Sequence, residues 1–485
     1  VYTLDGTLRY SAGEVVDTIT TGEDGTAQSQ PLYLGKFQVK EIQFPHGMVD
    51  TGENVTNVEL VYAGQEVEVT ETSASFYNQR QKALVTLDKV LEQDETFGIG
   101  MNGEISAVTF GLYAQEDITA ADGSVIPADG LLEIVSVNEN GQAVCSTDLP
   151  FGSFYLKELS TDSHYLLNGE TFPFTFEYGG PSIAVVEISA NDGEAVTNEL
   201  IRGEIKGLKT DENGTGLGGA VIGLFKSDET EFTAENALAT TTSADDGSFS
   251  FTNVPYGDWV LKELESPEGF ILSDEVIPVT VEEDGQVVEI SLANERVYGD
   301  LRLTKVDKDY PDNKLTGAEF EVYRDTNGNK ELDEGDELLG KLEETSTGIY
   351  EMSHILYGGV FVRETKAPEG FLLDENAYYV EITENGKIYE VENEAGVGFT
   401  NMAQTGSLRI EKTSSDGKVE GFSFRVTGAN GYDQTFKTDK NGEIFIEGLR
   451  VGDYTVSEVS DGASANYVLP ADKTVTIFAD KTTVA

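Results

Sequence analysis

The chain has 485 residues, and its 88 acidic residues far outnumber its 32 lysines and arginines, which gives a net charge of −56 at pH 7. Because nucleic acid and anionic membranes are bound by basic surfaces, this balance argues against both as partners and is typical of a soluble, self-repelling protein. The sequence has no zinc-ligand spacing, no Ser-His-Asp signature, no phosphate-binding glycine loop and no apolar run of membrane-spanning length. It therefore gives no indication of an enzyme with turnover.

A phrase that begins with glycine and carries a glutamate six residues later recurs along the chain. It reads GKFQVKEI from Gly35, GSFYLKEL from Gly152, GDWVLKEL from Gly257, GGVFVRET from Gly358 and GDYTVSEV from Gly452. In an extended strand the glutamate shares a face with the two apolar residues before it, so each copy aims a carboxylate at a hydrophobic core. These glutamates are Glu41, Glu158, Glu263, Glu364 and Glu458. They are spaced by roughly 100 residues, which is the size of a small domain.

The sequence around these phrases consists of short alternating runs separated by Asp-Gly and Asn-Gly turns, which is typical of β-hairpins and β-sandwiches. We therefore predict an all-β fold of tandem Ig-like or prealbumin-like β-sandwich domains. The predicted domains, called first to fifth below, are residues 1–82 (partial, lacking its first strand), 83–201, 202–297, 298–404 and 405–485 (partial, lacking its last strand). Their connections are a few residues long and are not rich in proline or serine, so we expect a semi-rigid rod.

Two further polar residues continue apolar faces near the ends of the predicted domains. A lysine does so in the opening phrases ALVTLDKV, EIKGLKTD, DLRLTKVD and SLRIEKTS, where it is Lys89, Lys209, Lys305 and Lys412. An asparagine does so in the closing phrases ASFYN, EAVTN, ISLAN and VGFTN, where it is Asn78, Asn198, Asn294 and Asn401. Because an unpaired buried charge is expensive, we interpret lysine, glutamate and asparagine as a set that meets inside each core.

These three kinds of side chain can form a cross-link without help from another protein. Burial lowers the pKa of a lysine and raises that of a glutamate, so both can be neutral at ordinary pH. A neutral lysine amine is a nucleophile, and a protonated glutamate can polarise the asparagine carbonyl and then shuttle protons. With the groups held side by side, the product would be a Lys–Asn isopeptide bond, formed with loss of ammonia.

The phrases FVRETKAPEGF and VLKELESPEGF resemble the E-box of pilins. Together with the flanking lysines and asparagines, they make essentially the whole chain similar to the collagen-adhesin B-type (SpaA-type, prealbumin-like) domains of Gram-positive surface proteins and pilins. The resemblance implies that the first-strand lysine bonds to the last-strand asparagine and that the E-box glutamate catalyses the reaction. Matched by position, the triads are Lys89–Glu158–Asn198, Lys209–Glu263–Asn294 and Lys305–Glu364–Asn401. The second domain has STDSHY where the third has ESPEGF, so its E-box match is shorter.

The first and fifth domains hold incomplete sets. Glu41 and Asn78 have no lysine, whose place would fall before the first residue, and Lys412 and Glu458 have no asparagine, whose place would fall after the last. We expect these to be truncated domains of a longer protein that cannot close their own bonds. The alternative for every set is a solvated lysine and glutamate on an exposed face, with the asparagine in a turn.

The acidic stretch DTNGNKELDEGDE is a candidate calcium site. Asp325, Asn327, Asn329, Asp333 and Asp336 fall at positions 1, 3, 5, 9 and 12 of a calcium loop, and the Glu331 carbonyl falls at position 7. However, glycine stands at position 4 instead of 6, and position 12 is aspartate instead of glutamate. The alternative is an acidic hairpin tip without metal, so calcium is the only cofactor considered and none is required.

From these features we predict a structural protein, a stalk or pilin-like shaft that is secreted and held at the cell wall or cell surface of a Gram-positive bacterium. Because the cross-link would form once, we do not class the chain as an enzyme. Its partners would be other pilin subunits. The alternative is an adhesin that binds a host extracellular matrix protein or a glycan through its sandwich faces or loops. A hydrolytic surface enzyme is disfavoured because the residues for turnover are missing.

Overall fold

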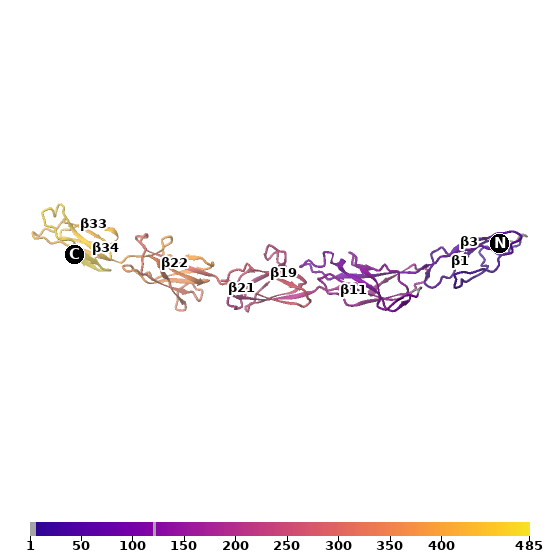
Figure 1. Cartoon of the computed structure of the whole chain (residues 1–485). Coiled ribbons are helices and arrows are strands. Elements are labelled where there is room, and N and C mark those ends of the chain that lie inside the picture. Colours follow the sequence, from indigo (N-terminus) through magenta and orange to yellow (C-terminus); the bar gives the residue numbers. More distant parts are fainter. Residues whose placement is uncertain (1–5, 120–122) are drawn as a thin grey trace.

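The structure, a computed structural model, describes residues 6–119 and 123–485 as an extended row of β-rich units with the two termini at opposite ends (Figure 1). Apart from three short 3-10 turns, η1 (Glu104–Ala107), η2 (Ala190–Gly193) and η3 (Ala429–Gly431), the regular structure of these residues is β-strand. The prediction of an all-β rod is confirmed. No helix in the described ranges is long and apolar enough to cross a membrane.

The third domain shows the shared architecture in its simplest form. Its strands are β15 (Arg202–Asp211), β16 (Val221–Lys226), β17 (Ala239–Thr242), β18 (Ser248–Pro255), β19 (Gly257–Glu265), β20 (Val276–Val281) and β21 (Val287–Asn294). One sheet has the order β18-β15-β21 and the other has β17-β16-β19-β20. Alternate residues of both sheets, among them Ile205 and Leu261, are buried in one hydrophobic core. The first strand and the glutamate-bearing strand therefore lie in different sheets, on either side of this core.

The glycine that opens each repeated phrase has a conformational role. Its φ is +154° at Gly35, +155° at Gly152, +136° at Gly257, +111° at Gly358 and +132° at Gly452. Residues with a Cβ rarely adopt these angles. In the third, fourth and fifth domains this glycine stands where the chain leaves a strand of one sheet and begins the glutamate strand of the other, so the recurrence of glycine there follows from this turn.

The fourth and fifth domains repeat the arrangement. The fourth has β22 (Tyr298–Asp307), β23 (Glu319–Arg324), β24 (Glu337–Lys341), β25 (Glu343–Ser346), β26 (Ile349–Leu356), β27 (Gly358–Lys366), β28 (Ala377–Ile382), β29 (Ile388–Glu390) and β30 (Phe399–Asn401). Its sheets are β25-β26-β22-β29, with β30 also on β22, and β24-β23-β27-β28. The fifth has β31 (Thr405–Glu411), β32 (Ser423–Gly428), β33 (Tyr432–Lys437), β34 (Glu443–Arg450), β35 (Gly452–Val459), β36 (Lys473–Ile477) and β37 (Thr482–Val484). Its sheets are β34-β31-β37 and β33-β32-β35-β36.

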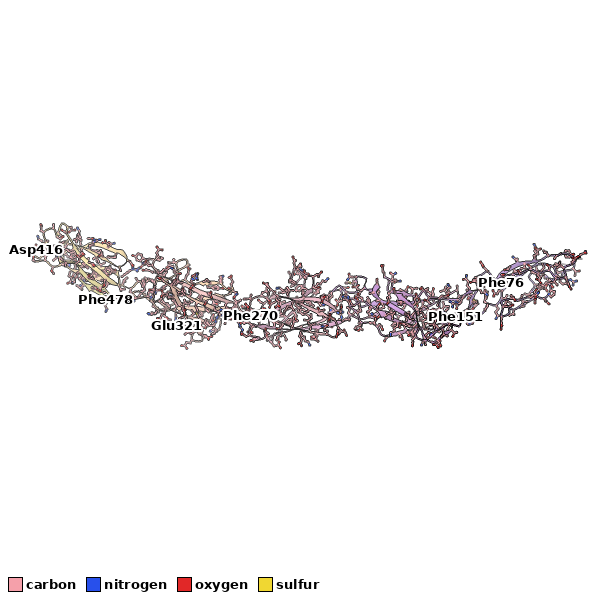
Figure 2. The ribbon with its side chains drawn as sticks, viewed as in Figure 1. Phe76, Phe151, Phe270, Glu321, Asp416 and Phe478 are labelled. Carbon is pink, nitrogen blue, oxygen red and sulfur yellow. The ribbon has the colours of Figure 1, made fainter. Side chains whose placement is uncertain are left out.

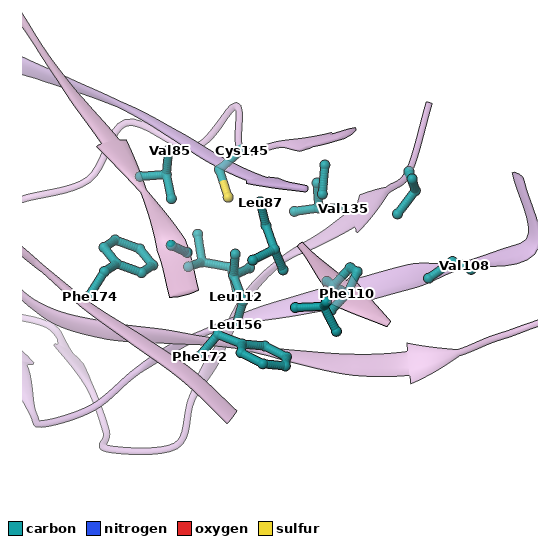
Figure 3. Close-up of a cluster of buried hydrophobic side chains, with 14 of the residues drawn as sticks. Val85, Leu87, Val108, Phe110, Leu112, Val135, Cys145, Leu156, Phe172 and Phe174 are labelled. Atoms are coloured by element: carbon teal, nitrogen blue, oxygen red, sulfur yellow. The ribbon is translucent and has the colours of Figure 1, made fainter. Parts of the chain in front are cut away.

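The second domain has the same two sheets and a larger core. Its strands are β5 (Lys82–Leu91), β6 (Thr109–Ala114), β7 (Ile118–Thr119), β8 (Val125–Ile126), β9 (Leu131–Ser136), β10 (Gln142–Val144), β11 (Gly152–Ser160), β12 (Thr171–Phe176), β13 (Val185–Ser189) and β14 (Val196–Asn198). Figure 3 shows Leu87 and Leu156, from opposite sheets, in a core that also contains Cys145. Burial raises the pKa of this thiol to about 12, so Cys145 behaves as a small core residue.

The first domain has little of this architecture. Its strands β1 (Gly35–Lys40), β2 (Met48–Val49), β3 (Val55–Leu60) and β4 (Gln79–Arg80) form two separate pairs, β1-β3 and β2-β4. Val49 is the one buried hydrophobic residue in the described part of this domain, whereas Tyr62 and Tyr77 are exposed. The glutamate-bearing strand β1 thus has no facing sheet.

The strand order explains the rod. In the second to fifth domains the first strand pairs in parallel with the strand or strands that close the domain. Because parallel neighbours run in the same direction, the chain enters at one end of the sandwich and leaves at the other. Consecutive domains are therefore stacked end to end, as Figure 1 shows.

The joints between domains contain both ion pairs and packed rings. Arg202, at the start of β15, reaches back to Glu92 and Asp94 of the second domain at 3.0 Å each. Phe97 of the second domain packs on Trp259 of the third, with ring centroids 4.9 Å apart. In Figure 2, the labelled Phe151 and Phe270 lie where neighbouring domains meet.

Candidate functional site

Each complete triad takes its side chains from both sheets of its domain. In the third domain β15 and β21 are parallel neighbours, and Asp211 pairs with Asn294. Lys209 lies two residues before Asp211 and so shares a face with Asn294. Glu263 comes from β19 in the facing sheet. The pairing register therefore brings together three residues that are far apart in the sequence.

The third domain holds its triad in a chain of contacts. Lys209 Nζ donates a hydrogen bond to Asn294 Oδ1, and Asn294 Nδ2 donates to Glu263 Oε1 at 2.8 Å. Lys209 Nζ lies 3.4 Å from Glu263 Oε1. The amide thus directs its oxygen at the amine and its nitrogen at the carboxyl group.

The fourth domain has the same arrangement with more contacts. Lys305 Nζ donates to Asn401 Oδ1 and to the carbonyl oxygen of Phe399, the latter at 3.1 Å. Asn401 Nδ2 donates to the two carboxyl oxygens of Glu364 at 3.0 and 2.8 Å. Lys305 Nζ is 3.5 Å from Glu364 Oε1 and 4.9 Å from the centre of the Phe399 ring.

The second domain holds a complete triad as well, despite its shorter E-box match. Lys89 Nζ donates to Asn198 Oδ1 at 2.7 Å and lies 3.8 Å from Glu158 Oε1. Asn198 Nδ2 donates to Glu158 Oε1 and Oε2 at 3.1 and 3.0 Å, and to Thr161 Oγ1 at 2.9 Å. The spacing of the three residues was therefore a better guide than the Pro-Glu-Gly ending.

The lysine and glutamate side chains of the three complete triads are 0% exposed. They do not form the solvated pair on an exposed face that was the alternative. Because burial removes water from the ammonium group, the pKa of Lys89 and of Lys305 falls from the ordinary 10.5 to about 8, and that of Lys209 is also lowered. In each case the charge of the partner glutamate opposes part of this shift.

A backbone N–H that sequence reasoning missed fixes the second oxygen of each glutamate. Glu158 Oε2 accepts from the N–H of Asn168 at 2.6 Å, Glu263 Oε2 from Ser273 at 2.9 Å, and Glu364 Oε2 from Asp374 at 2.9 Å. All three donors end a phrase of the form aromatic-x-Leu-polar: YLLN, FILS and FLLD. The corresponding phrase in the fifth domain is YVLP, which ends in Pro470, a residue without an N–H.

A β-bulge directly follows the glutamate in the complete triads. The pairing shifts register immediately after Glu158, Glu263 and Glu364. A bulge bends its strand and redirects nearby side chains. In the fifth domain β35 pairs with β32 through Glu458 without such a shift.

The first and fifth domains contain the predicted partial sets. In the first, Asn78 Nδ2 donates to Glu41 Oε1 at 2.9 Å. In the fifth, Lys412 Nζ pairs with Glu458 Oε2 at 2.8 Å. The repeated pattern thus brings together the residues that each partial set possesses.

The predicted calcium residues form a hydrogen-bonded loop. Asp333 Oδ2 accepts from Asn327 Nδ2 and Asn329 Nδ2 at 2.9 Å each, and Asp325 Oδ1 accepts from a backbone N–H of the loop. Further contacts use the N–H of Glu331 and both carboxyl oxygens of Asp336.

Oxygen donors of this kind suit calcium. Nevertheless, in the described part of the chain no three His, Cys, Asp or Glu side chains are grouped to hold a metal ion. Calcium binding remains a prediction, tested by calorimetric titration of the full chain.

The fold and the site thus define a chain of tandem β-sandwich domains, three of which bury a lysine, a glutamate and an asparagine across the core. The chain matches the SpaA prealbumin-like fold domain over residues 203–296, 299–395 and 406–485, which is more than half of its length. It therefore belongs to the SpaA prealbumin-like family. No curated protein sequence gives a significant match.

Several solved structures resemble the chain in fold. The Bacillus anthracis TIE protein is 21% identical, with a TM-score of 0.49, 78% of this chain covered and 68% of that one. BcpA, the major pilin subunit of Bacillus cereus, is 16% identical, with a TM-score of 0.30, 59% of this chain covered and 98% of that one. A streptococcal ancillary pilin is 17% identical, with a TM-score of 0.25, 67% of this chain covered and 99% of that one.

Proposed function

We propose that the three complete triads form Lys–Asn isopeptide bonds and that the chain is a structural rod of the bacterial surface, a stalk or a pilin-like shaft. One observation carries this proposal. In three domains a buried lysine amine contacts an asparagine amide oxygen, while a buried glutamate accepts from the nitrogen of the same amide.

The reaction follows from this placement. The neutral amine of Lys305 attacks Cγ of Asn401, so that the Nζ–Cγ bond forms and the Cγ–Nδ2 bond breaks. Glu364 takes a proton from Nζ and delivers one to Nδ2, which leaves as ammonia. Its hydrogen bonds to Nδ2, at 3.0 and 2.8 Å, place the carboxyl group for this transfer. The product is a neutral amide where a buried ammonium would otherwise remain, and its formation needs no cofactor.

The bonds would stabilise the domains and carry load. They would close loops between residues 109, 85 and 96 positions apart in the second, third and fourth domains. In the chain-entropy model, a loop of this size stabilises by roughly 4–5 kcal/mol. An amide, unlike a disulfide, is not broken by reductants.

This function involves a single event per triad, so the proposal does not make the chain an enzyme. A shaft of this kind would act outside the cell, held at the wall or surface, and its partners would be further subunits. The adhesin alternative makes a different prediction, namely saturable binding of the chain to an extracellular matrix protein or a glycan.

Intact mass spectrometry tests the cross-links directly. The chain should be lighter than its sequence mass by three ammonia molecules, and tryptic digestion should release joined peptides that contain Lys89 with Asn198, Lys209 with Asn294 and Lys305 with Asn401. Glu364→Ala should restore one ammonia to the mass and make the fourth domain cleavable by trypsin.

The matched control is Glu369→Ala, five residues along the same E-box, where the side chain is exposed. The mass of this control should still be lower than its sequence mass by three ammonia molecules. A mass of the unaltered chain equal to its sequence mass would refute the proposal, as would a loss of three ammonia molecules in the Glu364→Ala variant.

A further inference from the structure

The loop that follows the triad glutamate makes the same turn in the second, third and fourth domains, although its sequence differs in the second. A backbone N–H to carbonyl bond of 3.1 Å closes this turn in each: Tyr165 to Asp162, Phe270 to Pro267 and Phe371 to Pro368. Because the turn is retained, the residue directly before it stands in a comparable place relative to each triad. This residue is Thr161 in the second domain, Ser266 in the third and Ala367 in the fourth.

Among these three residues, only the threonine contacts the asparagine amide. Asn198 Nδ2 donates to Thr161 Oγ1 at 2.9 Å, in addition to its bonds with the triad glutamate. Ser266 Oγ instead donates to the carbonyl oxygen of Phe270 at 3.0 Å, and Ala367 has no hydroxyl group. The second domain thus has a polar group of its own at the point where its sequence departs from the E-box.

The amide nitrogen has a further acceptor in two of the three triads. In the fourth domain Asn401 Nδ2 donates to the carbonyl oxygen of Leu372 at 2.8 Å, besides its bonds to the glutamate. In the third, Asn294 Nδ2 has Glu263 as its only acceptor among the described residues. Thr161 therefore supplies from a side chain the bond that a backbone carbonyl supplies in the fourth domain, and a side chain can be replaced.

This further acceptor gains importance as the reaction proceeds. When Glu158 delivers a proton to Nδ2 of Asn198, the nitrogen acquires positive charge and becomes the leaving group. Hydrogen bonds from a charged donor are stronger than those from a neutral amide. The bond to Thr161 Oγ1 therefore strengthens between the starting state and the transition state, and an interaction that does so accelerates the reaction.

We infer that Thr161 is a further catalytic residue of the second domain, which accepts a hydrogen bond from the leaving nitrogen of Asn198 and eases its departure as ammonia. The Lys89 Nζ–Cγ bond forms, the Cγ–Nδ2 bond breaks, and Glu158 relays a proton from Nζ to Nδ2. The threonine keeps its own proton throughout. This role rests on the cross-linking chemistry proposed above.

The experiment follows bond formation in the full chain as it is made by cell-free synthesis. Samples are quenched in acid at successive times and digested, and mass spectrometry measures the fraction of Lys89 and Asn198 peptides that are joined. Thr161→Val keeps the shape of the side chain but removes the acceptor, so it should slow this bond roughly tenfold and leave its final yield unchanged. The bonds of the third and fourth domains, measured in the same samples, should form at their usual rates.

Two further variants separate the chemical role from a structural one. Thr161→Ser retains the hydroxyl and should keep the rate within about threefold of that of the unaltered chain. Ser266→Ala removes the hydroxyl at the comparable place in the third domain, where it does not contact the amide, and should leave the rate of the third-domain bond unchanged. A merely structural role of Thr161 would instead lower the final yield of the second-domain bond in Thr161→Val.

The outcomes separate this inference from the proposed function. If Thr161→Val forms the second-domain bond at the unaltered rate or with a lower final yield, or if Thr161→Ser is as slow as Thr161→Val, the role of Thr161 is overturned and the cross-links stand. If the unaltered chain forms none of the three bonds, the cross-linking chemistry fails and this role fails with it. A slower bond in Thr161→Val that Thr161→Ser restores supports both.

Discussion

Replacing Asn401 by alanine leaves Lys305 with no amide to join, so the stability of the fourth domain should become dependent on pH. The Lys305 side chain is 0% exposed, and burial lowers its pKa from 10.5 to about 8. Below about pH 8 the amine is protonated in both the folded and the unfolded chain, and the full cost of the buried charge is present. Above about pH 8 Lys305 loses its proton in the folded chain. In the unfolded chain it keeps the proton until the pH approaches the ordinary lysine pKa of 10.5.

The sign and size of the effect follow from this difference. The unfolded state binds more protons between the two pKa values, so the free energy of unfolding rises with pH. Between about pH 7.5 and about pH 9.5 the linkage relation gives a gain of about 2 kcal/mol. The assay is calorimetry of the full Asn401→Ala chain at these two pH values, following the thermal transition that the substitution moves.

Two comparisons make this result decisive. Asn401→Ala combined with Lys305→Met should lose the pH dependence, because it removes the titrating amine. The unaltered chain should lack it too, since its Lys305 nitrogen would be part of an amide. The same pH dependence in the unaltered chain would show a free amine there and refute the cross-link. A flat response of Asn401→Ala would instead refute the reasoning from burial.

Three further changes test other parts of the structure. Gly358→Ala places a Cβ at a φ of +111° and should cost about 1–3 kcal/mol, seen as an earlier thermal transition of the fourth domain. Arg450→Ala removes the 2.9 Å bond to Asp307, a nearly buried carboxylate, and should loosen the joint between the fourth and fifth domains, so that X-ray scattering shows a shorter maximum dimension. Cys145, whose pKa burial raises to about 12, should resist alkylation at neutral pH until the chain is unfolded.

The fold and the triads could be predicted from the sequence because their signals are local and repeated. Glu364, for example, lies two residues from Val362 and four from Val360, and a period of two fixes which residues share a face. The same phrase in five copies then made an accidental pattern untenable. The lysine and the asparagine could be paired because they occupy the same place in the first and last strands of each of the three complete copies.

The groups that complete the site could not be predicted in this way. The N–H of Asp374 reaches Glu364 only because the loop after the E-box folds back, and its signal, a polar residue ending the phrase FLLD, has meaning only after the contact is known. The joint formed by Arg202 with Glu92 depends on how two domains stack, which no strand period encodes.

The position of each triad within its domain matters for a rod under tension. Force would enter the third domain at the start of β15 and leave at the end of β21, which runs parallel beside it. Without a cross-link, these strands would have to resist by the hydrogen bonds of their ladder, which yield in shear. A bond between Lys209 and Asn294 joins the far end of the first strand to the end of the last. The load would then pass through eight residues of β15 and one amide, and the sequence between the two cross-linked residues would carry none. This topology accounts for the lysine, which lies near the end of the first strand, and for the asparagine, which is the last residue of the last strand.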